Sequence, residues 1–438
     1  MNSPFPGQPP IKLPYQLKLI NALGPALKTL GLFNVYEDPE YYFRKARKQT
    51  KLTDFGTYDL EKPLKHLLPM LKNEGDLSLF GRITIYQLIH ESLVNNLLMQ
   101  EDFATTPELG NVDVEDPIIV VCTPRTGSTL LHNLLSLHEE SRSPRMWELC
   151  RPSPPPKPEL ETTDPRIKQS DSEVGMYYRL VPEMKAIHYF GPEAIEECTH
   201  LFANIFSCRF SFSTMVNSNS YMDWVMQDDM VEAYRSYKKH LQLLKFNYRK
   251  KILVLKSPAH IMSLDALSKV FPKARIVHLH RDPATAAASC CSLAEAVQIP
   301  LRKNIDPHAI GEMWNKYWTP ALLDSIKWRE NTDLNVIDIN YQDLMQDPAG
   351  EVSKIYRHFG LDIPETLPSR VNQYLANHPK NEFGKHEYSL ERYGLNSDEL
   401  YQQYADYIKY FDVPLDKKNQ RQDTLNNIEE ILAEPTAV

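Results

Sequence analysis

The sequence lacks long hydrophobic runs and has little cysteine. No stretch approaches the roughly 18 consecutive apolar residues of a membrane-spanning helix, and residues 1–10 contain no basic residue, unlike the start of a secretory leader. The six cysteines of this 438-residue chain have no CxxC spacing, which is typical of a protein kept in a reducing compartment. We therefore expect a cytoplasmic protein without an integral membrane segment.

The chain also lacks an excess of positive charge. It has 49 basic against 57 acidic residues, a net charge of −8, which argues against a nucleic-acid partner. With 42% hydrophobic and 24% charged residues, the composition excludes disorder, collagen and coiled coil. Glycine is scarce beside proline, 15 against 33, which indicates long irregular connections. Any bound anion must be held by a local group of residues.

Four short β-branched runs predict strands buried on both faces. They are residues 117–123, 251–255, 274–280 and 334–339. Each is followed by a segment compatible with a helix, and a short run that is apolar on both faces is typical of a parallel strand covered by helices. Repeated strand–helix units predict an α/β core with a parallel sheet flanked by helices.

The segments around this core predict a helical extension and a long insertion. The expected domains are an N-terminal helical extension at residues 1–112, the α/β domain at 113–415 and a polar tail at 416–438. Apolar periodicity predicts helices in the extension at residues 17–32, 41–50, 58–72 and 78–98. The insertion at 152–248 opens with PSPPPKP, so we expect first a loop and then helices at 194–206 and 228–244.

The string TPRTGST at residues 123–129, the phosphate loop, joins the first predicted strand to an apolar helix. Such a loop directs backbone N–H groups and the positive end of the helix dipole toward one point, which suits a phosphate or sulfate. Ser128 occupies the position of the Walker lysine, and Arg125 can replace the missing charge. The alternative is that the string only caps a helix.

Two further basic groups follow other predicted strands. Lys256 ends the second main strand and Arg281 ends the third, with Ser289 eight residues later on the next helix. Ligands of parallel sheets bind beyond the carboxyl ends of the strands, so these side chains can converge on one polyanion. Taken singly, each basic group can be a solvated strand end, and Asp282 can be a helix N-cap.

The strings PRTGST, LKSP, HRDP and YQDL resemble, in combination, the sulfotransferases that use 3′-phosphoadenosine-5′-phosphosulfate (PAPS). The resemblance spans about residues 117–411. It implies a P-loop-like α/β fold and transfer of a sulfuryl group from PAPS to the hydroxyl of a small molecule or carbohydrate. It also implies a donor site made of Arg125, Thr126, Gly127, Ser128, Thr129, Lys256, Arg281, Ser289, Tyr341, Lys385 and His386.

Within that donor site the resemblance implies separate roles. The phosphate loop would hold the 5′-phosphosulfate, Arg281 and Ser289 the 3′-phosphate, and Tyr341 would lie beside the adenine. Lys256 would neutralise the bridging or transferring oxygens. Lys385 and His386 fall where the family has a late basic loop, but the local sequence at 384–388 differs from that of the cytosolic branch.

The acceptor hydroxyl must lose its proton, so the site needs a base. We expect the chain to re-enter the sheet edge after residues 141–146 and to bring Glu148 into the cleft. A glutamate at a similar distance serves this purpose in the tyrosylprotein and trehalose branches of the family. The aryl branch uses histidine, which leaves His188, His200 and His260 as alternatives. The predicted catalytic residues are Glu148, Lys256, Arg125 and His200.

Two other functions are considered. A P-loop kinase or NTPase using ATP is opposed by the missing GK pair and by the absence of a strand-end carboxylate for Mg²⁺. A non-catalytic scaffold would lack the phosphate ligands, which are present. We expect no metal, because a sulfuryl group carries less charge than a phosphoryl group. His278 and His280 share a strand face, but no third ligand is near them in the sequence.

The acceptor and other partners are less constrained by the sequence. The acidic surface favours a neutral alcohol or phenol as acceptor, and a homodimer is possible. Six aromatic residues of the insertion can line an acceptor pocket or form ordinary core. The apolar helix at residues 15–32 can lie on a membrane surface, although we expect it to pack on the α/β core.

Overall fold

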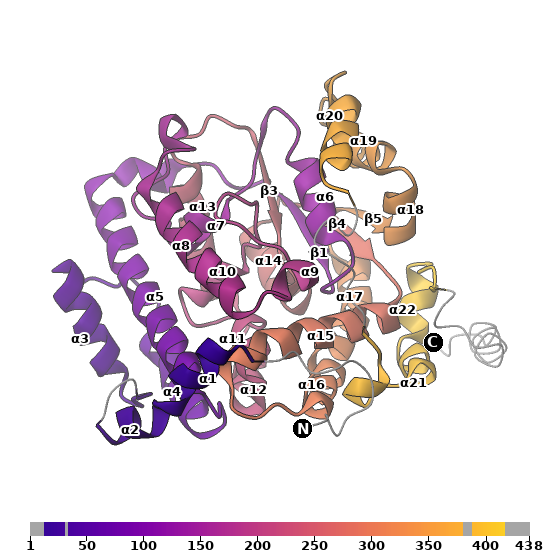
Figure 1. Ribbon diagram of the computed structural model, residues 1–438. Helices are drawn as coiled ribbons and strands as arrows, with labels where there is room; N and C mark the ends of the chain where they lie inside the picture. Colours follow the sequence, from indigo (N-terminus) through magenta and orange to yellow (C-terminus); the bar gives the residue numbers. More distant parts are fainter. Residues whose placement is uncertain (1–12, 31–33, 380–387, 417–438) are drawn as a thin grey trace.

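Five parallel strands form one sheet at the centre of the molecule (Figure 1). The structure is a computed structural model that describes residues 13–30, 34–379 and 388–416. The strand order is β2-β3-β1-β4-β5, and the strands are β1 (Ile118–Cys122), β2 (Ser141–Arg142), β3 (Ile252–Lys256), β4 (Arg275–His280) and β5 (Asn335–Asn340). The predicted α/β fold is confirmed, and all four main strands lie where the β-branched runs predicted them.

Both faces of the sheet are buried. In β1, Ile119 and Val121 belong to one hydrophobic cluster, while Ile118, Val120 and Cys122 belong to another on the opposite face. Successive side chains of a strand point to opposite faces, so a strand covered on both sides needs an uninterrupted apolar run. This is why β1 and the first four residues of β3 are apolar without interruption.

One face is covered by the helix that follows the phosphate loop and by helices from the C-terminal part of the chain (Figure 1). These are α6 (Ser128–Leu135), α18 (Tyr341–Gln346), α19 (Pro348–His358) and α20 (Leu367–Asn377). Val352, Ile355 and Tyr356 of α19 are fully buried in this layer. They follow the i, i+3, i+4 spacing of a helix face.

The other face is covered by a larger layer that includes the N-terminal helices. Its elements outside the insertion are α3 (Pro39–Thr50), α4 (Glu61–Asn73), α5 (Leu79–Thr105), η3 (Pro258–Ser263), α14 (Leu264–Val270), α15 (Pro283–Leu301), α16 (Pro307–Met313), the π-helical turn η4 (Trp314–Trp318), α17 (Thr319–Asn331), η5 (Glu391–Tyr393), α21 (Ser397–Gln403) and α22 (Ala405–Tyr410). The short helix η1 (Pro107–Asn111) belongs to a small separate cluster through Leu109. Buried residues of α3, α4 and α5 join the same cluster as the sheet residues. The proposed domain boundaries remain a prediction.

The apolar segment predicted as one helix at 17–32 forms two helices. They are α1 (Tyr15–Ala22) and α2 (Gly24–Thr29). Pro25 lies in the first turn of α2, where its missing N–H is tolerated, although the same residue could not continue α1. In the described part of the chain, no helix is both long and apolar enough to span a membrane.

The insertion is more helical than the sequence predicted. Its elements, with the helix that precedes it, are α7 (Met146–Cys150), η2 (Pro158–Leu160), α8 (Pro165–Leu180), α9 (Met184–Ile187), α10 (Thr199–Ala203), α11 (Ser211–Val216), α12 (Asn219–Met226) and α13 (Val231–Lys245). The expected loop gives way to α8, whose N-cap Asp164 accepts a hydrogen bond from the Arg166 N–H at 3.0 Å. Pro165 does not break α8, because it lies in the first turn, where a helix tolerates proline.

Candidate active site

The phosphate loop makes a sharp turn between β1 and α6. Arg125 and Gly127 both have a positive φ, 70° and 84° respectively. A side chain at position 127 would place its Cβ 2.8 Å from the Tyr341 ring, so only glycine fits between the turn and that ring. The loop leads directly into the N-terminus of α6, whose first N–H groups have no partner within the helix. The predicted anion-binding geometry is therefore present.

Side chains from two other parts of the chain contact Arg125. Its Nε donates a hydrogen bond to Ser289 Oγ of α15 at 3.1 Å, and Arg281 Nη1 donates to the Arg125 carbonyl at 2.7 Å. The Arg281 guanidinium also lies 4.2 Å from the centre of the Tyr341 ring and 3.9 Å from Asp416. In the described part of the chain no carboxylate pairs with Arg125, and burial lowers the pKa of its guanidinium. An anion bound here would compensate that charge.

Lys256 lies at the end of β3 with its side chain only 1% exposed. Its Nζ donates to Glu197 Oε1 at 2.7 Å and lies 3.5 Å from Thr129 Oγ1 of α6. Burial alone would lower the pKa of Lys256, but Glu197 and Glu196 outweigh it and the pKa is raised. The ammonium is therefore charged and stands between the phosphate loop and a carboxylate.

One cavity of about 470 Å³ joins this polar group to an apolar region. On the polar side it is lined by Arg125, Gly127, Ser128, Thr129, Arg281 and Tyr341. On the apolar side it is lined by Tyr177, Met184, Phe190, Met215, Leu293 and Val297. We call these two sides the donor half and the acceptor half. The apolar residues come from the insertion and from α15, where the sequence contains no recognisable motif.

Four titratable residues of the insertion line the cavity: His188, Glu196, Glu197 and His200. Burial lowers the pKa of His188 to about 4 and also lowers that of His200, so both rings are neutral at pH 7. Burial raises the pKa of Glu196 to about 7. For Glu197, the effect of burial is outweighed by Lys256 and His188, and its pKa is lowered. Glu197 is the ionised carboxylate of this group.

Comparison with known proteins assigns the family. A family model described as "Sulfotransferase family" matches residues 117–365, which is more than half of the chain. The chain belongs to the sulfotransferase family. The matched residues contain the phosphate loop, Lys256, Arg281 and Tyr341, and the predictions of a PAPS-dependent enzyme and of sulfuryl transfer to a hydroxyl acceptor are confirmed.

The sulfotransferase resembles curated and solved mycobacterial proteins. It is 25% identical over 290 residues to the omega-hydroxy-beta-dihydromenaquinone-9 sulfotransferase Stf3 of Mycobacterium bovis, covering 64% of this chain and 72% of that protein. The crystal structure of sulfotransferase STF9 from Mycobacterium avium superposes with a TM-score of 0.78 at 26% identity, covering 87% of this chain and 98% of that one. The crystal structure of sulfotransferase STF1 from Mycobacterium tuberculosis superposes with a TM-score of 0.74 at 28% identity, covering 85% of this chain and 100% of that one.

Glu148, the base expected from the sequence, lies outside the cavity of the sulfotransferase. The expected edge strand exists as β2 but ends at Arg142, and Glu148 lies on α7. Its carboxylate is fully buried and accepts hydrogen bonds from Arg142 Nη2 at 2.7 Å and from the Arg145 N–H at 2.8 Å. Both oxygens are therefore occupied in a structural ion pair and helix cap, which corrects the expected placement.

Of the three histidines considered as bases, two line the cavity and one does not. His188 and His200 line the cavity, whereas His260 is fully buried outside it. The two ring nitrogens of His260 contact Cys198 Sγ at 3.3 Å and Tyr234 Oη at 2.7 Å. Lys385 and His386 lie outside the described residues. Glu196 and Glu197, which also line the cavity, were not predicted as site residues, although two adjacent acidic residues close to His200 in the sequence were the available signal.

The kinase alternative is wrong, because the family assignment excludes it and Asp282 has a structural role. Asp282 is fully buried, caps α15 by accepting from the Thr285 N–H at 2.9 Å, and accepts from Tyr401 Oη at 2.8 Å. Its carboxylate is thus engaged within the protein. The capping role considered from the sequence matches these contacts.

A second group of titratable residues lies on the sheet away from the cavity. Asp338 of β5 lies opposite His278 of β4 in the strand register, so a third potential metal ligand is present that the sequence did not indicate. His280 already contacts Asp338 Oδ1 at 3.1 Å and Tyr407 Oη at 2.7 Å, and Arg329 lies 3.6 Å from the same carboxylate. His278 and His280 are buried whereas Asp338 is exposed, and His280 and Arg329 compensate the charge of its carboxylate.

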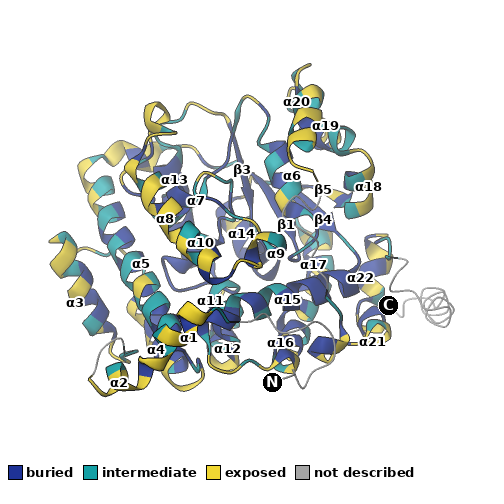
Figure 2. Cartoon of the chain, viewed as in Figure 1, coloured by how far each residue is buried: buried dark blue, intermediate teal, exposed yellow. Residues whose placement is uncertain are grey.

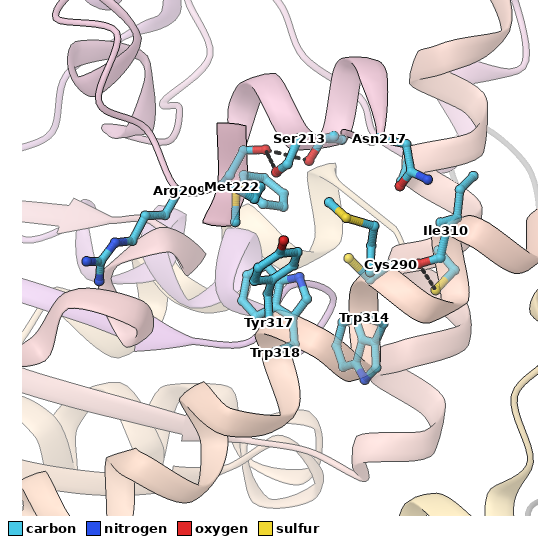
Figure 3. Close-up of a pocket in the computed structure, with 14 residues that line it drawn as sticks. Arg209, Ser213, Asn217, Met222, Cys290, Ile310, Trp314, Tyr317 and Trp318 are labelled. Atoms are coloured by element: carbon cyan, nitrogen blue, oxygen red, sulfur yellow. Dashed lines mark hydrogen bonds between the residues drawn. The ribbon is translucent and has the colours of Figure 1, made fainter. Parts of the chain in front are cut away.

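A smaller pocket of about 40 Å³ adjoins the acceptor half (Figure 3). Phe210 and Thr214 line both spaces, so α11 stands between them. Figure 3 shows Tyr317 and Trp318 of η4 near Cys290 of α15, whereas Arg209 extends away from the pocket. The volume holds about one water molecule, so this pocket is too small for an acceptor.

Proposed function

We propose that the sulfotransferase transfers the sulfuryl group from PAPS to the hydroxyl of a small, neutral, apolar alcohol or phenol. The observation that carries the proposal is the single cavity, in which the phosphate loop faces apolar side chains of the insertion. A charged donor in one half and an uncharged acceptor in the other would place the two reacting groups between the halves. We place them near Glu197, which lines the cavity and accepts a hydrogen bond from Lys256.

In the donor half, the phosphate loop and the N-terminus of α6 would bind the 5′-phosphosulfate of PAPS. Arg125 and Lys256 would supply the positive charge, and the proposed mechanism includes no metal ion. The hydroxyl of Thr129 lies 3.5 Å from the Lys256 ammonium. Arg281 and Ser289 would bind the 3′-phosphate, and the Tyr341 ring would lie beside the adenine. The existing contacts among Arg125, Arg281 and Ser289 support these assignments, because they hold the cations in place before the donor arrives.

Glu197 is the proposed base, in place of Glu148. It is the carboxylate bonded to Lys256, and Lys256 reaches the donor side through Thr129. When Lys256 turns toward the sulfuryl oxygens, it holds Glu197 less strongly, so the pKa of Glu197 rises and the carboxylate can accept the acceptor's proton. His200, neutral and in the same cavity, is the second candidate.

The acceptor class follows from the other half of the cavity. Aromatic and aliphatic side chains line it, and among the residues that the structure describes no Lys or Arg outside the donor half does. A neutral apolar molecule would be favoured there because apolar surface gains from leaving water. The Mycobacterium bovis relative is named for an omega-hydroxy dihydromenaquinone, which supports a hydroxyl group on a small molecule as the acceptor.

Location and assembly remain part of the proposal. All six cysteines are free thiols, which supports the predicted reducing, cytoplasmic environment. A nucleic-acid partner is not expected for a chain with a net charge of −8.

Label transfer tests this proposal directly. The full chain is incubated with labelled PAPS and a panel of aliphatic alcohols, sterols, phenols, sugars and peptides, and sulfated products are identified by mass spectrometry. We expect label on the apolar alcohols or phenols and none on sugars or peptides. Transfer only to sugars or peptides would contradict the acceptor class, and absence of PAPS-dependent transfer to every acceptor would contradict the donor assignment.

A further inference from the structure

The first two helices expose an unusual amount of apolar surface. Tyr15, Leu19, Leu23 and Leu30 are 71%, 52%, 60% and 71% exposed, and they are four of the eight large hydrophobic residues exposed in the described part of the chain. Tyr15, Leu19 and Leu23 recur at intervals of four residues, so they share one side of α1 and its C-terminal end. Such concentration of exposed apolar side chains marks an interaction surface.

The opposite side of α1 is packed on the acceptor half of the cavity. Leu17 is fully buried in a cluster with Tyr178 of α8 and Met184 of α9. Phe190 and Val297, which line the cavity, pack against the same cluster. One side of α1 thus supports the wall of the acceptor half, while the other faces solvent.

Hydrogen bonds fix these two helices to the core. Asn21 Oδ1 accepts from the Phe80 N–H at 3.1 Å, and Arg82 Nη2 donates to the Gly24 carbonyl at 3.2 Å. Both partners belong to α5. The exposed apolar side chains are therefore presented by an anchored element with a defined orientation.

The neighbouring segments add to this surface. Met176 of α8 is 49% exposed and Tyr189, which follows α9, is 47% exposed. The Tyr189 ring stacks at 6.2 Å on Tyr178, a member of the cluster around Leu17. Figure 2 shows exposed residues along both α1 and α8 on the side of the molecule that faces the viewer. With the four residues of the first two helices, Met176 and Tyr189 make six of the eight large hydrophobic residues that are exposed in the described part of the chain.

Charge distinguishes this region from the rest of the chain. Residues 1–36 contain three lysines and neither Asp nor Glu, although the whole chain carries −8. Lys18 and Lys28 are exposed on α1 and α2. On α1 and α2, apolar side chains are flanked by lysines without acidic residues, which complements the anionic surface of a lipid bilayer, although Glu173 and Glu183 are exposed on either side of Met176.

We propose that Tyr15, Leu19, Leu23, Leu30, Met176 and Tyr189 form a lipid-facing surface that rests on an anionic bilayer. On this surface the acceptor half lies directly behind α1, so an apolar alcohol dissolved in the bilayer can enter the cavity without crossing water. The second statement rests on the proposed function; the binding to lipid does not.

Vesicle flotation of the full chain tests the lipid-facing surface without donor or acceptor. The probe is vesicles of phosphatidylcholine with about one quarter phosphatidylserine. We expect the wild-type chain to float with them and the Leu19→Asp/Leu23→Asp variant to bind about tenfold or more weakly, since it places two charges in the apolar interface. The matched control is Leu160→Asp, another exposed leucine, on η2, which should float like the wild type.

The proposal is overturned by no flotation of the wild type, by equal flotation of the double variant, or by a wild-type dimer that the same variant dissociates. The last would assign the surface to a second copy of the chain. Thermal melting checks that each variant is folded. Transfer to a short, water-soluble alcohol separates the two proposals, because the double variant should keep that activity while losing activity on vesicle-embedded alcohols. Loss of both would contradict the lipid role of this surface.

Discussion

The two halves of the cavity are built in different ways. The donor half uses loops at the carboxyl ends of β1, β3 and β4, whose positions are fixed by the strand register. The acceptor half uses short helices of the insertion and one side of α15, which are held by apolar contacts. The donor half carries charge and directional hydrogen bonds, whereas the acceptor half is apolar. Donor binding should therefore depend on single residues, and acceptor choice on the combined shape of many.

The largest effect is expected where the halves meet. Replacing Glu197 by Gln removes the proposed base, and we expect turnover to fall about a hundred- to ten-thousand-fold, with donor affinity kept. Steady-state kinetics with saturating PAPS measures this. His200→Asn is the competing variant: if it abolishes turnover while Glu197→Gln does not, the base is the histidine.

Glu148 supplies a matched control for Glu197. Glu148→Gln breaks the buried pair with Arg142, so we expect a loss of stability of about 3 to 5 kcal/mol with little change in the turnover of the folded protein. Chemical denaturation and active-site-normalised kinetics separate the two effects. Full stability together with lost turnover would restore Glu148 to the catalytic site.

In the donor half, Arg281→Ala should weaken binding of adenosine 3′,5′-bisphosphate about tenfold to a hundredfold. The variant removes the guanidinium that stacks on Tyr341 and donates to the Arg125 carbonyl. Equilibrium dialysis with the nucleotide measures the loss. An unchanged affinity would show that the 3′-phosphate is bound elsewhere.

Changing the backbone of the phosphate loop at Gly127 should weaken donor binding about as much as removing one side chain of the donor half. Gly127→Ala adds a Cβ 2.8 Å from the Tyr341 ring at a residue with φ of 84°, so we expect the KM for PAPS to rise about tenfold. The Tyr341→Ala/Gly127→Ala double variant removes the steric conflict and should lose less than the two single effects combined. If the effects of the two single substitutions simply add in the double variant, the close approach of position 127 to the Tyr341 ring is contradicted.

A change in the acceptor half should leave the donor untouched. Phe190→Ala removes one apolar lining side chain, and we expect the KM for an apolar acceptor to rise about tenfold with the KM for PAPS unchanged. Two-substrate kinetics gives both values. If both KM values rise together, the two halves are not independent.

The smallest effect concerns pH and stability. Burial raises the pKa of Glu196 from 4.5 to about 7, so the folded state holds this proton more tightly than the unfolded state. The stabilisation is complete below the unfolded pKa and is lost as the pH rises through the folded pKa. Between about pH 5 and pH 8 the Tm of the wild type should therefore fall relative to that of Glu196→Gln. If the Tm of the wild type and that of Glu196→Gln change in parallel with pH, the raised pKa of Glu196 is contradicted.

The difference between the donor half and the acceptor half also explains which features could be predicted from the sequence. Strands β1, β3, β4 and β5 were predictable because each is an apolar run of strand length, and the parallel order places Arg125, Lys256 and Arg281 at one edge. Glu148 was misplaced because β2 has only two residues and its sequence does not show where the strand ends. Glu197 was missed because its position depends on how the insertion folds over Lys256, which no local pattern encodes.

Calorimetric titration of adenosine 3′,5′-bisphosphate into Arg125→Ala and Glu197→Gln tests the central claim most directly. Arg125 is the half-buried cation of the phosphate loop, whereas Glu197 is separated from that loop by Lys256. We expect Arg125→Ala to lose about a hundredfold or more in affinity, while Glu197→Gln binds as tightly as the wild type or more tightly. Wild-type affinity in Arg125→Ala would contradict the assignment of the phosphate loop as the donor site.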